Sequence, residues 1–66
     1  MIVKLNDKPY EVVEGTTLNM FIENLGIPLQ GIAIAVDYEV VPKNEWNFRK
    51  LTDGMALMLI HATSGG

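Results

Sequence analysis

The sequence predicts a single α+β domain, in which a mixed sheet of four to five strands wraps around one helix. Three observations lead to this fold class. The chain has 66 residues, which is the size of one small domain. Short apolar runs with the period of a strand lie before and after one stretch with the period of a helix. A single helix can cover one face of one sheet.

The first two strands are predicted to form a hairpin. Apolar and polar residues alternate over residues 1–5, which is a strand signal. Residues 6–8 are expected to form the turn, because Asn and Asp side chains bond to nearby backbone groups. The second strand is expected over residues 10–14, with Pro9 at its start, where a missing N–H group does least harm.

One helix is predicted at about residues 18–25. Its apolar residues have the i, i+3, i+4, i+7 spacing of one helical face: Leu18, Phe21, Ile22 and Leu25. Thr17 precedes them as the expected N-cap, because its hydroxyl can accept from an otherwise unpaired N–H group. Gly26 suits the left-handed position after the last turn, Ile27 can fold back onto the helix, and Pro28 prevents its continuation.

Two strands are predicted after the helix. The third strand covers residues 32–37, with Ile and Val on one face and Ala33 and Ala35 on the other. Both faces are apolar, so we expect the strand to be covered on both or to lie beside a partner-binding surface. A tight turn at 37–39 leads to a short fourth strand at 40–41.

The last part of the domain contains one long apolar strand. Residues 43–50 are expected to be irregular or to form a single helical turn, with Trp46 and Phe48 beneath the sheet. After a turn, residues 55–62 form the final strand, which is strongly apolar. Residues 63–66 follow as a flexible tail of small residues that have no side chain to anchor them.

Composition and charge exclude several classes of function. The chain has no cysteine and one histidine, so disulfides, Cys-ligated zinc or iron–sulfur sites and a multi-His metal site are not expected. The net charge of −3 argues against nucleic acid as a partner. No apolar run approaches the roughly 20 residues that cross a bilayer, and the N-terminus lacks the features of a signal peptide. We therefore expect a cytoplasmic protein with no membrane partner.

No catalytic constellation is present in the sequence. It has no second histidine, no cysteine and no Gly-rich phosphate loop that opens a helix. His61 is the only side chain that titrates near neutrality without help. We interpret it as a strand histidine at the sheet edge or surface, because a general base needs a pocket and partners. The chain is not expected to be an enzyme.

The end of the chain is its most unusual feature. An apolar strand runs directly into Thr-Ser-Gly-Gly. Glycines lack Cβ atoms and fit a channel too narrow for other residues, and four extended residues reach about 13 Å. A carboxylate on such a lead can enter another protein's active site and be activated there. A frayed terminus is the simpler structural interpretation, and these residues alone leave both open.

Four segments together resemble a known family. The opening MIVKLNDKPYEVVEGTTL has a strand, an Asn turn, a strand and a Gly-Thr helix start. Residues 35–46 contain a Val-Pro-basic-x-x-Trp motif, and residues 51–54 a Leu-x-Asp-Gly turn. The chain ends in Gly65-Gly66. In order and spacing, over nearly the whole chain, these segments resemble the ThiS family of ubiquitin-like β-grasp sulfur carriers of thiamine biosynthesis.

Two positions depart from the family's usual pattern. Met55 stands where an acidic residue is common, and Lys43 where Arg is frequent. Neither residue touches the terminal chemistry. Met55 adds apolar surface to the predicted last strand, which is expected to bear on partner choice.

The resemblance implies a ubiquitin-like β-grasp fold, with one sulfur carrier domain over residues 1–66 and residues 63–66 as its reactive tail. It implies that an E1-like adenylyltransferase of the ThiF type adenylates the Gly66 carboxylate, using ATP and magnesium. A sulfurtransferase or cysteine desulfurase then supplies sulfur, and the resulting thiocarboxylate donates it to a thiazole synthase of the ThiG type. Gly65 gives access to the partner's channel. No cofactor is expected on the chain itself, because ATP and magnesium are bound by the partner.

A docking surface is predicted from the period of the strands. If Leu57 and Leu59 face the helix, then Met58 and Ile60 face outward. The two alanines of the neighbouring third strand, Ala33 and Ala35, are expected to join them. Apolar side chains on an open sheet face indicate an interaction surface, and Met suits a surface that must fit several partners.

Three rival functions stay open on the sequence. A carrier of the molybdopterin pathway would use the same thiocarboxylate, although those chains tend to be longer between the helix and the last strand. A β-grasp interaction module would have an incidental Gly-Gly end and would tolerate deletion of Gly66. A protein-conjugating modifier would form high-mass isopeptide conjugates with lysines.

Overall fold

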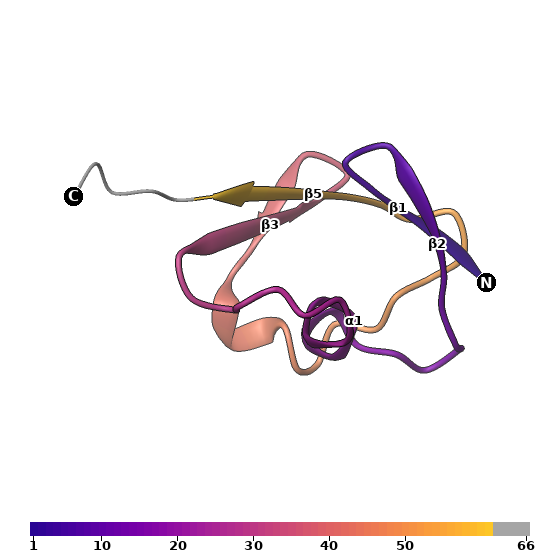
Figure 1. Ribbon diagram of the computed structural model, residues 1–66, viewed down its shortest axis with the longest axis horizontal. Coiled ribbons are helices and arrows are strands. Elements are labelled where there is room, and N and C mark those ends of the chain that lie inside the picture. Colours follow the sequence, from indigo (N-terminus) through magenta and orange to yellow (C-terminus); the bar gives the residue numbers. More distant parts are fainter. Residues whose placement is uncertain (62–66) are drawn as a thin grey trace.

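The computed structural model describes residues 1–61, and their elements follow the predicted order β-β-α-β-β-β (Figure 1). The elements are β1 (Ile2–Leu5), β2 (Lys8–Glu11), α1 (Leu18–Asn24), β3 (Ile32–Val36), β4 (Glu39–Val41), a short 3₁₀ helix η1 (Lys43–Glu45) and β5 (Ala56–His61). Two predictions lie outside the described residues: the end of the last strand at Ala62 and the flexible, reactive tail at 63–66.

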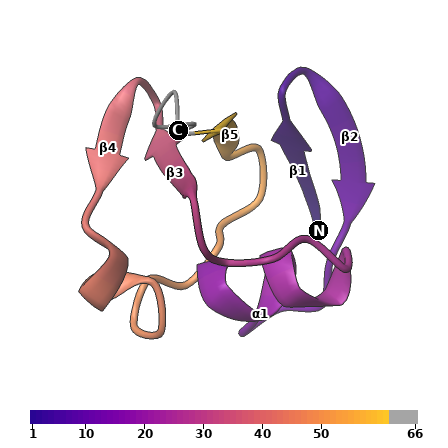
Figure 2. The same ribbon diagram turned by 60° about the vertical axis from the view of Figure 1, so that its left-hand side comes forward.

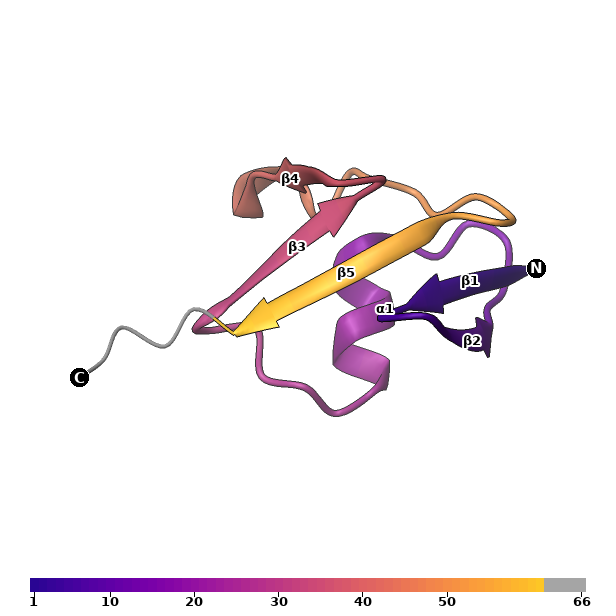
Figure 3. The ribbon, with the colours of Figure 1, turned by 90° about the horizontal axis from the view of Figure 1, so that it is seen from above.

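β5 is the middle strand of a five-stranded sheet with the order β2-β1-β5-β3-β4. It pairs parallel to β1 and antiparallel to β3, and each outer strand pairs antiparallel with its hairpin partner. Figure 2 shows the two hairpins on either side of β5, with α1 beneath them. Figure 3 shows β5 running between β1 and β3. The predicted α+β class, with a mixed sheet around one helix, is confirmed.

The helix begins and ends as the sequence predicts. The hydroxyl of Thr17 accepts from the N–H group of Met20 at 3.2 Å and so caps the first turn. At the other end Gly26 has φ +75°, and the N–H group of Ile27 donates back to the carbonyl of Ile22. This left-handed cap ends α1 after Asn24. Among residues 1–61, no helix is long and apolar enough to span a membrane.

The core lies between α1 and the inner face of the sheet. The buried apolar residues come from every part of the fold: Val3, Leu5, Leu18, Phe21, Ile22, Ile34, Val36, Val41, Trp46, Leu51 and Leu57. Tyr10 of β2 meets Phe21 of α1 edge to face, with ring centroids 5.7 Å apart. The helical face that the apolar spacing predicts is therefore the face that the sheet covers.

The first hairpin has a tighter turn than the sequence suggests. Leu5 pairs with Lys8, so Asn6 and Asp7 alone form the turn. Their φ angles are +51° and +68°, as a two-residue turn between twisted strands requires. The predicted three-residue turn over 6–8 is therefore one residue too long.

The predicted second strand, at 10–14, is wrong at both ends, because β2 covers Lys8–Glu11. Pro9 lies inside β2, opposite Lys4, next to the pair that closes the hairpin. Hydrogen-bonded and non-hydrogen-bonded pairs alternate along an antiparallel ladder, so the missing N–H group of Pro9 faces the open edge. Proline is tolerated there because β2 is an edge strand.

Of the two aromatic residues predicted beneath the sheet, one is buried and the other is not. Trp46 is 2% exposed, and its indole N–H donates to the carbonyl of Val41 at 2.9 Å. Phe48 is 81% exposed, so its predicted placement is wrong. The backbone continues in helical turns from η1 past Trp46 to Phe48. Because residues two apart in such turns point in different directions, Phe48 does not share the buried side with Trp46.

The second hairpin turn holds its backbone in an unfavourable region. The turn consists of Asp37 and Tyr38, so β3 ends and β4 begins one residue earlier than predicted. Both residues have positive φ, +51° and +70°. This region is uncommon for Asp and strained for a bulky side chain such as Tyr. The side chain of Tyr38 is nearly fully exposed, so burial does not offset this strain.

Replacing Trp46 by Ala should unfold much of the protein. Loss of a buried Trp costs about 3–5 kcal/mol, which is comparable to the whole stability of a domain this small. Phe48→Ala is the matched control and should change the free energy of unfolding by less than about 0.5 kcal/mol. Urea titration followed by far-UV circular dichroism measures both. Equal losses from the two variants would contradict the assignment of Trp46 as the buried member.

Replacing Tyr38 by Gly should stabilise the protein by about 1 kcal/mol, because Gly adopts positive φ without steric cost. Tyr38→Ala is the control, since it removes the phenol and keeps the Cβ atom that causes the strain. The midpoint of urea unfolding should rise for the first variant only. A rise for both would show that the exposed ring, and not the backbone, is the cause.

Candidate functional site

The sheet narrows toward the end of β5, where the predicted reactive tail follows. β1 ends at Leu5, which pairs with Leu57, and β4 ends at Val41, which pairs with Ile34 opposite Leu59. Beyond this level, the described pairing of β5 is with β3 alone. We call residues 32–33 and 60–61 the terminal ribbon. Figure 3 shows it as the end of the sheet from which the chain continues.

The residues predicted for docking share the outer face of the sheet. Met58 pairs with Ala35 and Ile60 with Ala33, and paired residues of neighbouring strands point to the same side. Met58 is 40% and Ile60 43% exposed. Leu57 is buried, and Leu59 packs against the core from the other side. The predicted division of β5 into an inner and an outer face is therefore confirmed, and the docking role itself stays a prediction.

The two alanines contribute less surface than expected. Ala33 is half-buried, and Ala35 is only 4% exposed. Ala35 lies between two larger exposed neighbours, Met58 of β5 and Val40 of β4, with which it pairs. A small side chain between two larger ones forms the floor of the face. Ala35 can therefore shape this surface but offers little area of its own.

Sequence reasoning missed other apolar side chains of the same face. Val40, paired with Ala35, is more exposed than Ile60, and Ile2 at the start of β1 is as exposed as Ile60. Ile2 lies two residues before Lys4, which pairs with Ala56 on the outer side of the sheet. The alternation of β1 already placed Ile2 opposite its buried residues, so this signal was available. Met55 lies before β5 and packs against the core, so it adds little to the outer face.

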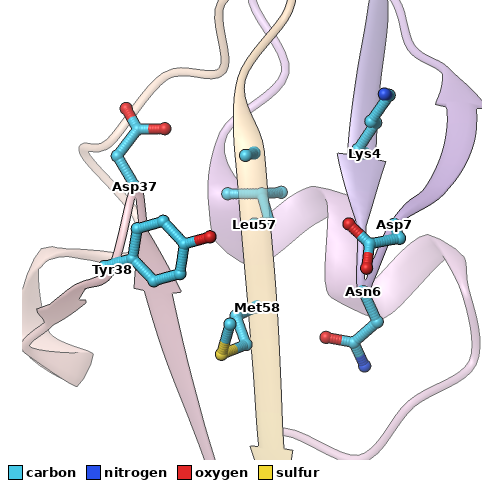
Figure 4. Close-up of a pocket in the computed structure, with 8 residues that line it drawn as sticks. Lys4, Asn6, Asp7, Asp37, Tyr38, Leu57 and Met58 are labelled. Carbon is cyan, nitrogen blue, oxygen red and sulfur yellow. The ribbon is translucent and has the colours of Figure 1, made fainter.

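A small hollow lies between the two hairpin turns, beside the first half of β5. It has a volume of about 110 Å³ and is lined by Lys4, Asn6, Asp7, Asp37, Tyr38, Ala56, Leu57 and Met58. Figure 4 shows Tyr38 and Met58 on one side of it and Lys4, Asn6 and Asp7 on the other. Small-molecule sites commonly measure about 300–1,000 Å³. The hollow is therefore smaller than the usual site of a cofactor or other small-molecule ligand.

A wider and more open hollow of about 450 Å³ lies near Met1 and Asp53. Its lining residue Asp53 comes shortly before β5 in the chain, so the hollow lies near the start of β5 and far from His61 at the end of that strand.

No group of three or more His, Cys, Asp or Glu within residues 1–61 could hold a metal ion. His61 is an exposed strand residue opposite Ile32, as the sequence predicts.

Comparison with known proteins adds independent information. The family model that matches the chain is described as "ThiS family", and the match covers residues 3–66. The chain is 27% identical over 66 residues to the "Sulfur carrier protein ThiS" of Escherichia coli (strain K12), and the match covers all of both chains.

Solved structures confirm the fold. A crystal structure of the thiamine biosynthesis protein (ThiS) from Geobacter metallireducens matches with a TM-score of 0.86 at 20% identity, over all of both chains. A solution NMR structure of a thiamine biosynthesis protein from the same organism gives 0.75 at 19% identity, covering 100% of this chain and 88% of that one. The predicted ubiquitin-like β-grasp architecture is thereby confirmed. Because the family model spans nearly the whole sequence, including both terminal glycines, the chain belongs to the ThiS family.

Proposed function

We propose that this protein is a sulfur carrier for thiamine biosynthesis. Its Gly66 carboxylate is converted to a thiocarboxylate, which donates sulfur for the thiazole ring. The observation that carries the proposal is that the family match continues to residue 66 and so includes Gly65 and Gly66. The relative from E. coli, matched over its full length, is itself named a sulfur carrier protein. In this role the chain is a co-substrate that partner enzymes modify, and it catalyses nothing itself.

The chemistry follows from the low reactivity of a carboxylate, whose charge and resonance oppose nucleophilic attack. An E1-like adenylyltransferase of the ThiF type joins the Gly66 carboxylate to the α-phosphate of ATP, and pyrophosphate leaves. Persulfide sulfur from a sulfurtransferase or cysteine desulfurase then attacks the acyl carbon, and AMP leaves. This attack forms a C–S bond and keeps the S–S bond of the persulfide. A thiol reductant then cleaves that S–S bond, is itself oxidised to a disulfide, and leaves the thiocarboxylate for a thiazole synthase of the ThiG type. ATP and Mg²⁺ bind to the adenylating partner.

The fold supports this role through the position of the strand that precedes the proposed reactive end. That strand, β5, lies in the middle of the sheet, between β1 and β3. Gly65 and Gly66 carry no Cβ atoms and so suit a narrow channel in a partner. The outer face, with Met58 and Ile60 at its centre, lies on the same strand that leads to this end.

The outer face is the proposed docking surface for these partners. Met58 and Ile60 lie next to Ala33 of β3, and Ala35 forms the floor between Met58 and Val40. The exposed apolar side chains extend across β5 and β4, which makes one contiguous surface instead of scattered residues. A partner that binds there receives the chain end from the adjoining terminal ribbon.

Intact mass is the first test of the carrier chemistry. Protein purified from cells that can load it should contain a species about 16 Da heavier, because sulfur replaces one terminal oxygen. Oxidation of any of the four methionines adds nearly the same mass, so the shift must be mapped to the C-terminal peptide. Deletion of Gly66 should abolish it.

An unmodified terminus after incubation with the adenylating partner, ATP and a sulfur donor would contradict the proposal. It would favour an interaction module with an incidental Gly-Gly end. High-mass conjugates with lysines would instead indicate a protein modifier.

Docking is tested by placing a charge on the outer face. Ile60→Asp should weaken binding to the adenylyltransferase at least about tenfold, because an interface core tolerates an unpaired carboxylate poorly. Val13→Asp is the matched control, since Val13 is an exposed apolar residue in the loop after β2. Isothermal titration calorimetry gives both dissociation constants. Equal affinities of the two variants for the adenylyltransferase would contradict the assignment of the outer face as the docking surface.

A further inference from the structure

Asn6 joins the two ends of the described chain. Its side-chain Oδ1 accepts from the N–H group of Leu59 at 3.0 Å, and its Nδ2 donates to the carbonyl of Leu59 at 3.4 Å. The two residues are 53 positions apart in the sequence. Figure 4 shows Asn6 beyond the end of β1, with its amide beside β5. One side-chain amide thus binds both backbone groups of one residue in the middle strand.

This pair of bonds continues the β1–β5 ladder past the end of β1. The N–H group of Lys4 donates to the carbonyl of Met55 at 2.9 Å, and that of Asn6 donates to Leu57 at 3.0 Å. After Met55 and Leu57, Leu59 is the next residue of β5 whose backbone N–H and carbonyl groups point toward β1, since the orientation alternates from one residue to the next. The chain has already turned away at Asn6, where φ is +51°. The side-chain amide therefore replaces the peptide group of a missing strand residue.

The position of Leu59 gives these bonds their importance. At its level β5 still has neighbours on both sides, the Asn6 amide and Ile34 of β3. Beyond it comes the terminal ribbon, whose described pairing is two-stranded. Two-stranded ribbons twist more than wider sheets do. Without the Asn6 amide, the section of β5 held by β3 alone would begin at Met58 instead of Ile60, two residues earlier, because Leu57 is the last residue of β5 that pairs with β1.

The turn itself does not require an asparagine amide. Asp7, the next residue, adopts φ +68° in the same turn. Gly and Asp also suit such positions. An aspartate at position 6 could accept from the Leu59 N–H group, but it has no donor for the Leu59 carbonyl. The amide is the group that satisfies both.

We propose that Asn6 is a positioning residue for the C-terminal carboxylate, acting through its two hydrogen bonds to Leu59, which fix the direction in which β5 leaves the sheet. This inference rests on the proposed carrier function. A docked carrier whose last strand is fixed presents its carboxylate to the adenylating site in a larger fraction of complexes. A carrier with a loose last strand docks equally well but reacts more slowly.

Asn6→Gly, with Asp7→Gly as the matched control, tests this proposal. Both substitutions place Gly at a turn position with positive φ, and only the first removes the amide. Hydrogen exchange of the Leu59 amide should become about tenfold faster in Asn6→Gly, with the β3–β5 ladder unchanged. Steady-state pyrophosphate release by the adenylyltransferase, with the persulfide donor and a thiol reductant present and the carrier as varied substrate, should show kcat about tenfold lower and KM within about twofold. Asp7→Gly should match the wild type in both measurements.

The division between kcat and KM separates positioning from a purely structural role. A variant that is only less stable lowers the concentration of folded carrier, and this raises the apparent KM without changing kcat. Asn6→Asp should recover part of the lost kcat, because it keeps the acceptor for Leu59. If Asn6→Gly fails to fold, Asn6→Asp takes its place in the test, and the kcat of Asn6→Asp should lie below that of Asp7→Gly.

The outcomes distinguish the two proposals. If the wild type releases no pyrophosphate and acquires no terminal sulfur, the carrier function is overturned, and this inference falls with it. If the wild type reacts, and Asn6→Gly either keeps the kcat of Asp7→Gly or loses activity through KM alone, the positioning role is overturned and the carrier function stands. A fall in kcat with unchanged KM and faster exchange at Leu59 supports the positioning role.

Discussion

The placement of β5 between two hairpins is the constraint on which the rest of the structure depends. β1–β2 and β3–β4 are each formed by neighbouring segments, and neither pairs directly with the other. An isolated two-stranded hairpin is marginally stable at best in water. β5 pairs with both and carries Leu57 into the core beneath them. The order of the sheet and the closing of the core thus both depend on one strand.

This placement also links the core to the outer face. Side chains alternate along β5, so the same six residues supply Leu57 to the core and Met58 to the surface. A slip of one residue in the register would bury the outer side chains and expose the inner ones. The packing of the inner side chains in the core therefore also determines which residues of β5 form the outer face.

Local patterns predicted the parts of the fold that are held by local interactions. The helix was predictable because Thr17, Gly26 and the apolar spacing act within a few residues of one another. The faces of β5 followed from its alternation. The start of β2 did not, because Pro9 is acceptable there only on an edge strand, and the topology decides which strand lies at the edge.

The features that escaped prediction depend on long-range contacts. Trp46 and Phe48 are equally apolar in the sequence, and the direction of the turn between them decides which is buried. The burial of Ala35 depends on the size of side chains on two other strands. The bonds from Asn6 to Leu59 join positions 53 residues apart, so no nearby pattern indicates them. The residues at the centre of the proposed chemistry, Gly65 and Gly66, were prominent from the sequence alone.

The central position of β5 also governs the order in which the protein can assemble. The two hairpins can form early, since their strands are close in sequence, but the sheet closes only when a strand some fifty positions away inserts between them. Closing so long a loop costs entropy before any contact compensates for it, which slows folding relative to helical proteins of this size. A nascent or clipped chain that stops short of Ala56 has hairpins but no shared sheet. Every molecule that reaches the native state therefore already contains β5, the strand that precedes the proposed site of sulfur loading.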